Sequence, residues 1–193
     1  MHPEVYNPAE DTFLLLDAID VTETDTVFEM GTGTGIIALA CAQKGASVLC
    51  SDINPFALYL AKKNYEQNKK KLPGIITIKK GSLFDVVSES EQFSLIIFNP
   101  PYLPTSNDDS VDGYGWFDAA VDGGLTGLKL TLPFLENLSN YLYEKGRAFT
   151  LFSTASSRDK FNKILRDNHL KSIVVSSLSF TDETVEVHKI IKK

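Results

Sequence analysis

Short apolar runs and longer amphipathic segments alternate along the chain. Runs rich in branched and aromatic residues predict buried strands at residues 26–30, 47–52, 75–78 and 93–98. Helical spacing of apolar residues predicts helices at 13–19, 36–42, 55–68, 128–144 and 156–168. Further strands are predicted at 147–152, 173–178 and 184–191. This alternation, with two closing strands, predicts a doubly wound α/β sheet whose last strand is antiparallel.

The tetrapeptide Asn99-Pro100-Pro101-Tyr102 follows the strand predicted at 93–98. Ligands bind at the carboxyl ends of strands in open α/β sheets. The prolines fix the backbone and carry no N–H, so the Pro100 carbonyl and the Asn99 amide oxygen can both accept hydrogen bonds from one planar NH2 group. Tyr102 offers a flat face for stacking. A simple strand-ending turn is the alternative, because Asn and Pro are common turn residues.

A glycine loop, Gly31-Thr32-Gly33-Thr34-Gly35, joins the first predicted strand to the helix at 36–42. Glycines let the backbone approach a ligand closely, and the start of the helix offers free N–H groups. The dinucleotide fingerprint requires Gly or Ala at the next position, which is Ile36 here. The loop therefore predicts a nucleotide-like ligand and disfavours one with a pyrophosphate.

Polar residues at three other element ends are candidate ligand contacts. Asp52 ends the second predicted strand, at the spacing from the glycine loop where a carboxylate meets ribose hydroxyls. Alternatively, it caps the helix at 55–68. Residues 10–12, Glu-Asp-Thr, either cap the first helix or also reach a ligand. Ser82 and Leu83 follow the third strand, where a ligand's base can be contacted in this kind of fold.

Composition and charge narrow the class of protein. The 193 residues fit one domain, 1–193, and 43% hydrophobic with 23% charged residues is ordinary for a globular protein. The net charge of -6 disfavours duplex nucleic acid as a partner. The two cysteines lack a CxxC spacing, and no apolar run reaches membrane-spanning length. We expect a cytoplasmic protein without a membrane segment, a redox pair or a bound metal.

The segment 104–124 is long and lacks periodicity, which is typical of a functional lid or of disorder. It contains the single tryptophan, Trp116. Its acidic residues Asp108, Asp109 and Asp112 do not fit a calcium-loop pattern, so we expect them to be solvated.

Three features coincide: Glu29 before the glycine loop, Asp52, and the Asn-Pro-Pro-Tyr tetrapeptide. Together they resemble the class I S-adenosylmethionine-dependent methyltransferases, over nearly the whole chain. Within this class the chain is similar to the HemK family of protein glutamine methyltransferases, particularly its short archaeal and eukaryotic release-factor type. Pro-Ala-Glu-Asp-Thr-Phe at 8–13 and Gly-Gly-x-x-Gly at 123–127 carry that closer likeness. The resemblance implies a Rossmann-like fold: a seven-stranded, mostly parallel sheet with an antiparallel last strand and helices on both faces.

The resemblance also implies the reaction: N5-methylation of the glutamine in the Gly-Gly-Gln loop of a translation release factor, with S-adenosylmethionine as donor. The implied cofactor-binding residues are Thr12, Glu29, Gly31, Gly33, Asp52, Ser82, Leu83 and Asn99. The implied substrate-binding residues are Asn99, Pro100, Pro101 and Tyr102, of which Asn99, Pro100 and Tyr102 are the catalytic candidates. At Ser82 many relatives carry Asp. We expect no general base, because the proton can leave after transfer.

The family resemblance further implies a small zinc-binding activator protein. In this fold the third strand lies at a sheet edge, and Ile75–Ile78 contains no proline and no charge. An exposed apolar edge invites pairing with another chain, so we expect docking there and expect Ile76→Lys to abolish it. The alternative is an edge shielded by Lys79 and Lys80.

Two other functions are compatible with the sequence. Asn-Pro-Pro-Tyr also suits an exocyclic amine of adenine or guanine in RNA or DNA, which the acidic net charge disfavours. The second alternative is a subunit that binds the cofactor but catalyses no reaction. In that case Asn99→Ala would retain both cofactor binding and biological function.

Overall fold

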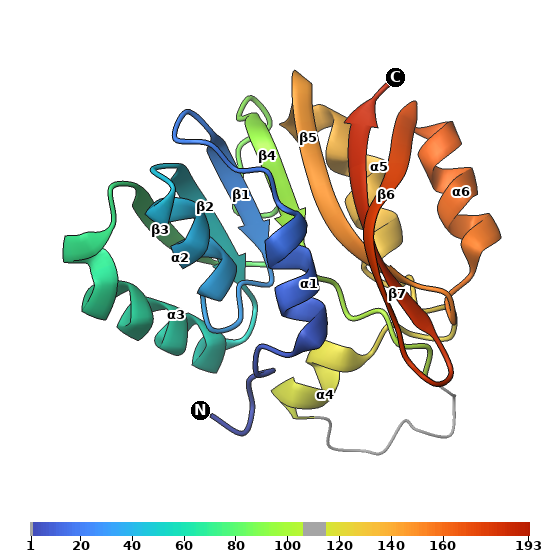
Figure 1. The fold of residues 1–193 in the computed structure, drawn as a ribbon, viewed down its shortest axis with the longest axis horizontal. Coiled ribbons are helices and arrows are strands. Elements are labelled where there is room, and N and C mark those ends of the chain that lie inside the picture. Colours follow the sequence, from blue (N-terminus) through green and yellow to red (C-terminus); the bar gives the residue numbers. More distant parts are fainter. Residues whose placement is uncertain (1, 106–114) are drawn as a thin grey trace.

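Seven strands form one sheet, with helices on both of its faces (Figure 1). The computed structural model describes residues 2–105 and 115–193. The strands are β1 (Thr26–Met30), β2 (Ser47–Asp52), β3 (Ile75–Lys80), β4 (Phe93–Phe98), β5 (Leu142–Ser153), β6 (Leu170–Ser179) and β7 (Thr184–Lys192). The helices are α1 (Glu10–Ala18), α2 (Ile36–Gln43), α3 (Pro55–Asn68), α4 (Trp116–Val121), α5 (Thr131–Tyr141) and α6 (Arg158–Asp167), with a 3-10 turn η1 (Lys69–Lys71).

The strand order is β3-β2-β1-β4-β5-β7-β6. The pairs from β3 through β5 are parallel, whereas β7 runs antiparallel between β5 and β6. The predicted α/β sheet with an antiparallel last strand is therefore confirmed. The chain moves outward from β1 to β3 and then crosses to β4 on the other side of β1. Such a reversal between β1 and β4 is where ligands bind in this architecture.

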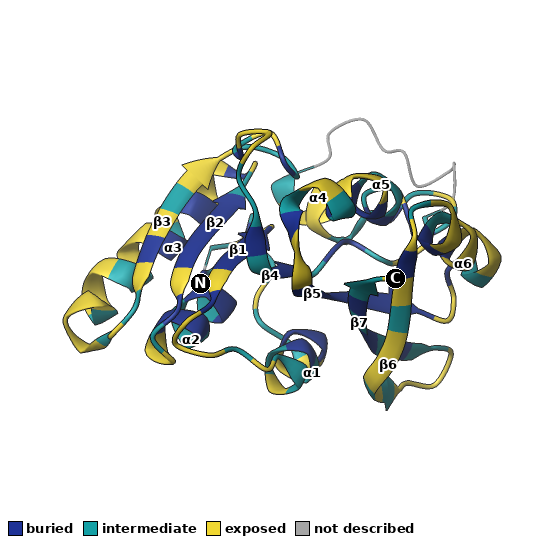
Figure 2. Ribbon diagram, turned by 90° about the horizontal axis from the view of Figure 1, so that it is seen from above, coloured by how far each residue is buried: buried dark blue, intermediate teal, exposed yellow. Residues whose placement is uncertain are grey.

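Alternating apolar side chains of the central strands build a core on each face of the sheet. Phe28 and Met30 of β1 pack on the face covered by α5 and α6. Val27 packs on the opposite face, under α1 and α2. The central strands are accordingly buried along their length in Figure 2, and exposure rises toward the edge strands.

The helix predicted at 128–144 is too long at both ends. The observed α5 begins at Thr131 and ends at Tyr141, and β5 starts directly at Leu142. Leu142 is fully buried and pairs with Phe93 of β4. An apolar residue at this position satisfies both the helical and the strand period, so the pattern alone could not locate the boundary.

The predicted edge position of β3 is confirmed. Ile76, however, is buried, so Ile76→Lys cannot test docking on its own, and its predicted effect stays a prediction. The Ile76 side chain is only 6% exposed and belongs to the core, whereas its neighbour Ile75 is 64% exposed. A lysine at position 76 would bury an ammonium group, which destabilises the fold itself. Any loss of a partner from that variant would then have two causes.

The segment 104–124 is described only in part. Its second half contains α4, which begins at Trp116. The predicted solvation of Asp108, Asp109 and Asp112 lies outside the described residues. Within residues 2–105 and 115–193, no helix combines the length and apolar character needed to cross a membrane.

Candidate active site

One cavity opens where β1, β2 and β4 end, at the predicted position in the sheet. Nine of the residues proposed from the sequence line it: Thr12, Glu29, Gly31, Gly33, Asp52, Asn99, Pro100, Pro101 and Tyr102. Ser82 and Leu83 are not among the lining residues. They lie beyond β3, in a turn where Asp85 N–H donates to the Ser82 carbonyl at 3.0 Å. A contact between either residue and a ligand's base stays a prediction.

The glycine loop leaves room for a ligand directly above its backbone. Gly33 has φ +55°, and a Cβ at this position would meet no protein atom within 4 Å, because it would stand in the open cavity. Gly35 has φ +81°, and its Cβ would lie 3.2 Å from Ala61 of α3. The loop therefore packs tightly against α3 on one side and offers bare backbone to the cavity on the other.

Asp52 ties the glycine loop to the end of β2. One carboxylate oxygen accepts from the Gly33 N–H at 2.9 Å, and the other accepts from the Asn54 N–H at 2.9 Å. Burial raises the pKa of Asp52. Asn54, rather than Asp52, caps α3, since its side chain accepts from the Phe56 N–H. Each Asp52 oxygen keeps a second lone pair, which can accept from a ligand hydroxyl.

Glu29 lies at the end of β1 and is almost fully buried. Desolvation raises the pKa of its carboxyl group to about 8, and the nearby charge of Asp52 acts in the same direction. The Thr32 hydroxyl donates to Glu29 at 2.7 Å and partly opposes this shift. The group nearest the start of the glycine loop is therefore a carboxyl that holds its proton at neutral pH.

The Asn-Pro-Pro-Tyr segment leaves β4 and forms the opposite wall of the cavity. Within residues 2–105 and 115–193, nothing hydrogen-bonds to the Asn99 side chain, so its amide oxygen can accept from a ligand. The Tyr102 hydroxyl donates to Asp11 of α1 at 3.2 Å. Burial strongly raises the pKa of Tyr102, with the Asp11 charge as a second cause, so the phenol stays protonated.

The start of the chain supplies lining residues that were predicted from the sequence in part. Of the candidate residues 10–12, Asp11 and Thr12 line the cavity, whereas Glu10 is exposed and does not. Tyr6, which was not predicted from the sequence, also lines the cavity and donates its hydroxyl to Asp11 at 3.1 Å. The role of Tyr6 has no local signal, because it depends on the segment before α1 folding back over the sheet's carboxyl edge.

Helix α4 lines the cavity and belongs to the segment 104–124, which the sequence predicts to be either a functional lid or disordered. Trp116 and Val121 line the cavity together with the two alanines between them, Ala119 and Ala120. The backbone N–H of Trp116 donates to Glu4 at 2.6 Å. The cavity thus combines an apolar wall, a bare glycine backbone and three carboxyl groups, those of Asp11, Glu29 and Asp52. These groups fit a nucleoside with an apolar extension better than they fit a phosphate, because no lysine or arginine is among the lining residues of the described part.

A family model described as the methyltransferase small domain matches residues 8–112, more than half of the chain. The chain belongs to that family. Like its relatives, this methyltransferase uses S-adenosylmethionine, which supplies an activated methyl group on a sulfonium. The cavity fits that cofactor: Asp52 can accept from the ribose hydroxyls, Gly33 allows close approach, and the apolar wall can cover the rest.

Curated relatives narrow the methyltransferase further. A protein of Methanocaldococcus jannaschii, named provisionally as a protein N5-glutamine methyltransferase, is 42% identical over 85% of this chain and 80% of its own length. The catalytic subunit of the eRF1 methyltransferase of Schizosaccharomyces pombe, mtq2, is 27% identical over 83% of this chain and 76% of its own.

The fold is also similar to that of a solved methyltransferase structure. The Mtq2–Trm112 complex of E. cuniculi is described as responsible for methylation of the eRF1 translation termination factor. It contains a chain that matches this one with a TM-score of 0.75. The match covers 98% of this methyltransferase and 99% of that chain at 21% identity, so it shows the shared fold.

Proposed function

We propose that the protein transfers a methyl group from S-adenosylmethionine to the side-chain nitrogen of a glutamine in a translation termination factor. The observation that carries this proposal is the Asn99 amide at the end of β4, which lies in the same cavity as Asp52 and the glycine loop and has no hydrogen-bond partner within residues 2–105 and 115–193. The names of the relatives support it, since one is provisionally named a protein N5-glutamine methyltransferase and another is named an eRF1 methyltransferase catalytic subunit. Such a substrate also supports the expected cytoplasmic location.

In this proposal Asn99 and Pro100 bind the acceptor amide. An amide nitrogen is a weak nucleophile, because its lone pair is delocalised over the carbonyl. The Asn99 oxygen and the Pro100 carbonyl accept one N–H each and hold the nitrogen in a single orientation. Pro101 keeps the backbone rigid, and the Tyr102 ring supports the plane of the amide. Fixing the nitrogen at about 3–3.5 Å from the methyl carbon removes much of the entropic cost of reaction.

The cofactor is held by the other wall. Asp52 accepts from the ribose hydroxyls, and Gly31 and Gly33 let the backbone approach. Thr12 and Glu29 bind near the amino-acid end of the cofactor. Ser82 and Leu83 are proposed to contact the base, which requires the ligand to extend past Asp52 toward the turn after β3.

The first experiment tests both the proposed methyl donor and the proposed acceptor glutamine. The protein is mixed with methyl-labelled S-adenosylmethionine and the release factor of the same organism, in wild-type form and with the glutamine of its Gly-Gly-Gln motif changed to alanine. We expect label only on the wild-type factor. Label on bulk tRNA or rRNA instead would mean that the pocket binds a base amine.

Asn99→Ala separates an enzyme from a cofactor-binding subunit. We expect its methylation rate to fall by at least about 100-fold, because the acceptor nitrogen loses its orientation. The control is Asn137→Ala, which makes the same change at an exposed asparagine on α5 and should keep full activity. Retained biological function in Asn99→Ala would support the non-catalytic alternative.

A second protein subunit is supported by the name of the S. pombe relative, a catalytic subunit, and by the E. cuniculi complex. We propose that a small zinc-binding activator pairs with the free edge of β3, where Ile75 and Thr77 are exposed. Lys79 and Lys80, which shield the edge in the alternative interpretation, lie at its end, after the exposed Ile75 and Thr77. Ile75→Lys should prevent copurification, whereas Val174→Lys, on the exposed opposite edge strand β6, should not. Equal recovery with both variants would exclude docking on β3.

A further inference from the structure

We infer that Asp11 and Ser156 are positioning residues for methyl transfer, because they hold Tyr102 at its two ends. This inference rests on the proposed function of the Asn-Pro-Pro-Tyr segment. The two residues come from α1 and from the turn before α6, on either side of Tyr102 in the sequence. Neither needs to touch the acceptor, since each acts on the residue that ends the segment.

The hydroxyl end of Tyr102 is fixed by a carboxylate that cannot turn away. Asp11 is 4% exposed, and its Oδ2 accepts from the Tyr102 hydroxyl at 3.2 Å. Its Oδ1 accepts from the Thr12 N–H at 2.6 Å and from the Tyr6 hydroxyl at 3.1 Å. Because each oxygen already has a protein donor, rotation of the carboxylate would break at least one of these bonds. The ring of Tyr102 is therefore held in one orientation.

The backbone end of Tyr102 is fixed by Ser156. The Ser156 hydroxyl donates to the Tyr102 carbonyl at 3.0 Å, and Ser156 is not among the cavity-lining residues. Gly127 makes this contact possible. It has φ +67°, and a Cβ there would lie 2.0 Å from the Ser156 hydroxyl oxygen and 2.5 Å from the Tyr102 carbonyl oxygen. Any side chain at 127 would displace the serine or the carbonyl.

Leu103, the residue after Tyr102, is held by the segment 123–127, which also contains Gly127. Gly123 N–H donates to the Leu103 carbonyl at 2.9 Å, and Leu103 forms a parallel bridge with Asp122. A Cβ at Gly123 would lie 2.7 Å from that carbonyl. The Gly-Gly-x-x-Gly motif thus acts as a close-packed support behind the Asn-Pro-Pro-Tyr segment, which explains its glycines without a ligand contact.

This support determines where the acceptor amide sits. The chain from Tyr102 back to Asn99 passes through two prolines, whose φ angles are fixed. A shift of the Tyr102 peptide is therefore passed on to the Pro100 carbonyl and the Asn99 side chain rather than absorbed between them. Since small displacements of reacting groups cost large factors in rate, loosening Tyr102 should slow transfer without weakening cofactor binding.

Ser156→Ala removes the hydrogen bond to the Tyr102 carbonyl and tests this contact. Ser157→Ala is the matched control, because the side chain of the neighbouring Ser157 makes no capping bond to α6. We expect Ser156→Ala to lower kcat about tenfold, with the dissociation constant for S-adenosylmethionine within twofold of wild type and an unchanged melting temperature. Ser157→Ala should retain the wild-type kcat. A wild-type kcat in Ser156→Ala, or a loss of cofactor affinity equal to the loss of kcat, would overturn the assignment.

A double-mutant cycle tests the hydroxyl end. Tyr102→Phe and Asp11→Ala each remove the bond between these side chains, so the double variant should be no slower than the slower single variant. Rate losses that multiply would show that Asp11 acts independently of Tyr102. All rates are measured on whichever acceptor the wild-type protein labels, factor or RNA. A wrong substrate assignment would therefore appear in the wild-type reaction and leave this comparison intact.

Discussion

The carboxyl group of Glu29 makes the stability of the ligand-free protein depend on pH. Its pKa is about 8 in the folded protein and 4.5 when unperturbed, so the folded state binds its proton more tightly than the unfolded state. The free energy of unfolding must then decrease as pH rises from about 4.5 to about 8, and level off above. Glu29→Gln keeps a neutral group and should lack this decrease.

The test is urea denaturation of the wild type and of Glu29→Gln between about pH 5 and pH 9. The variant should gain stability relative to wild type as pH rises, with no further gain above about pH 8. A constant difference across the range would mean that Glu29 is ionised in the folded protein.

A substitution at Gly33 should have two effects that can be measured separately, backbone strain and a steric conflict with the cofactor. Gly33→Ala should cost about 1 kcal/mol of folding free energy, because φ is positive, and should weaken S-adenosylmethionine binding at least about tenfold, because the methyl group enters the cavity. Gly124→Ala is the matched control: its φ is +66°, but Gly124 does not line the cavity, and the atom nearest to its added Cβ would be Lys129 Cβ at 3.2 Å. Titration followed by the fluorescence of Trp116, which lines the cavity, gives both affinities. Equal affinities would exclude a ligand above Gly33.

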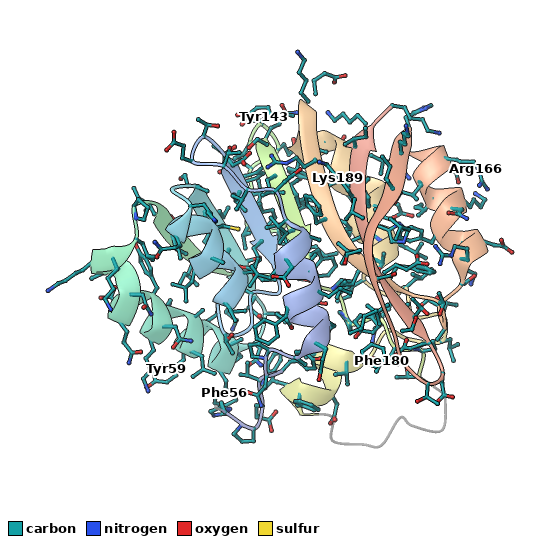
Figure 3. The ribbon with its side chains drawn as sticks, viewed as in Figure 1. Phe56, Tyr59, Tyr143, Arg166, Phe180 and Lys189 are labelled. Atoms are coloured by element: carbon teal, nitrogen blue, oxygen red, sulfur yellow. The ribbon has the colours of Figure 1, made fainter. Side chains whose placement is uncertain are left out.

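At the scale of elements, the N-terminal segment holds α4 over the cavity. The Glu4 carboxylate accepts from the first N–H of α4, at Trp116, and the Asn54 side chain donates to the Glu4 carbonyl at 2.7 Å. His2 stacks on Phe56 with ring centroids 4.2 Å apart, at the corner where Figure 3 labels Phe56. The segment therefore joins the start of α3 to the start of α4 across the mouth of the cavity.

Glu4→Ala should loosen this closure and speed cofactor release. We expect the dissociation rate of S-adenosylmethionine to rise about threefold to tenfold, since one charge-assisted hydrogen bond is lost. Stopped-flow fluorescence of Trp116 measures the rate. Glu10→Ala, which removes an exposed carboxylate outside the cavity lining, should leave the rate unchanged. An unaltered rate in Glu4→Ala would mean that α4 stays closed without its capping carboxylate.

Elements whose apolar residues pack in the core could be predicted from the sequence, whereas residues and elements that only line the cavity could not. The range of β4 was correct to the residue because its apolar run is buried on both faces. The helix α4 spans six residues, and its alanines face a cavity instead of the core, so no periodicity marks it. The bond between Tyr102 and Asp11 joins residues 91 apart, and such a pairing leaves no local pattern.

At the scale of the whole molecule, one end of the sheet forms the cavity and the opposite end carries an ion-pair network. The cavity lies at the carboxyl ends of β1, β2 and β4, near α4. An ion-pair network lies at the other end, where Arg147 of β5 donates to Asp25 at 2.6 Å and to Asp20 at 2.7 Å. Lys189 also pairs with Asp20, and it lies in the upper half of Figure 3, away from the cavity end. This network ties the chain before β1 to β5 and β7.

Arg147→Met should therefore lower stability without changing the reaction. Asp25 is 5% exposed, so losing its guanidinium partner should cost about 3–5 kcal/mol of unfolding free energy. Burial acts to raise the pKa of Asp25, but the bonds from Arg147 outweigh it and hold that pKa well below its usual range. The stabilisation is thus fully present above about pH 4. The stability difference between the two proteins should shrink progressively as the pH falls below that value and should persist in part at about pH 3. Arg166→Met, at an exposed arginine on α6, is the control for loss of charge. A changed kcat at a temperature where both variants are folded would mean that the two ends of the sheet are coupled.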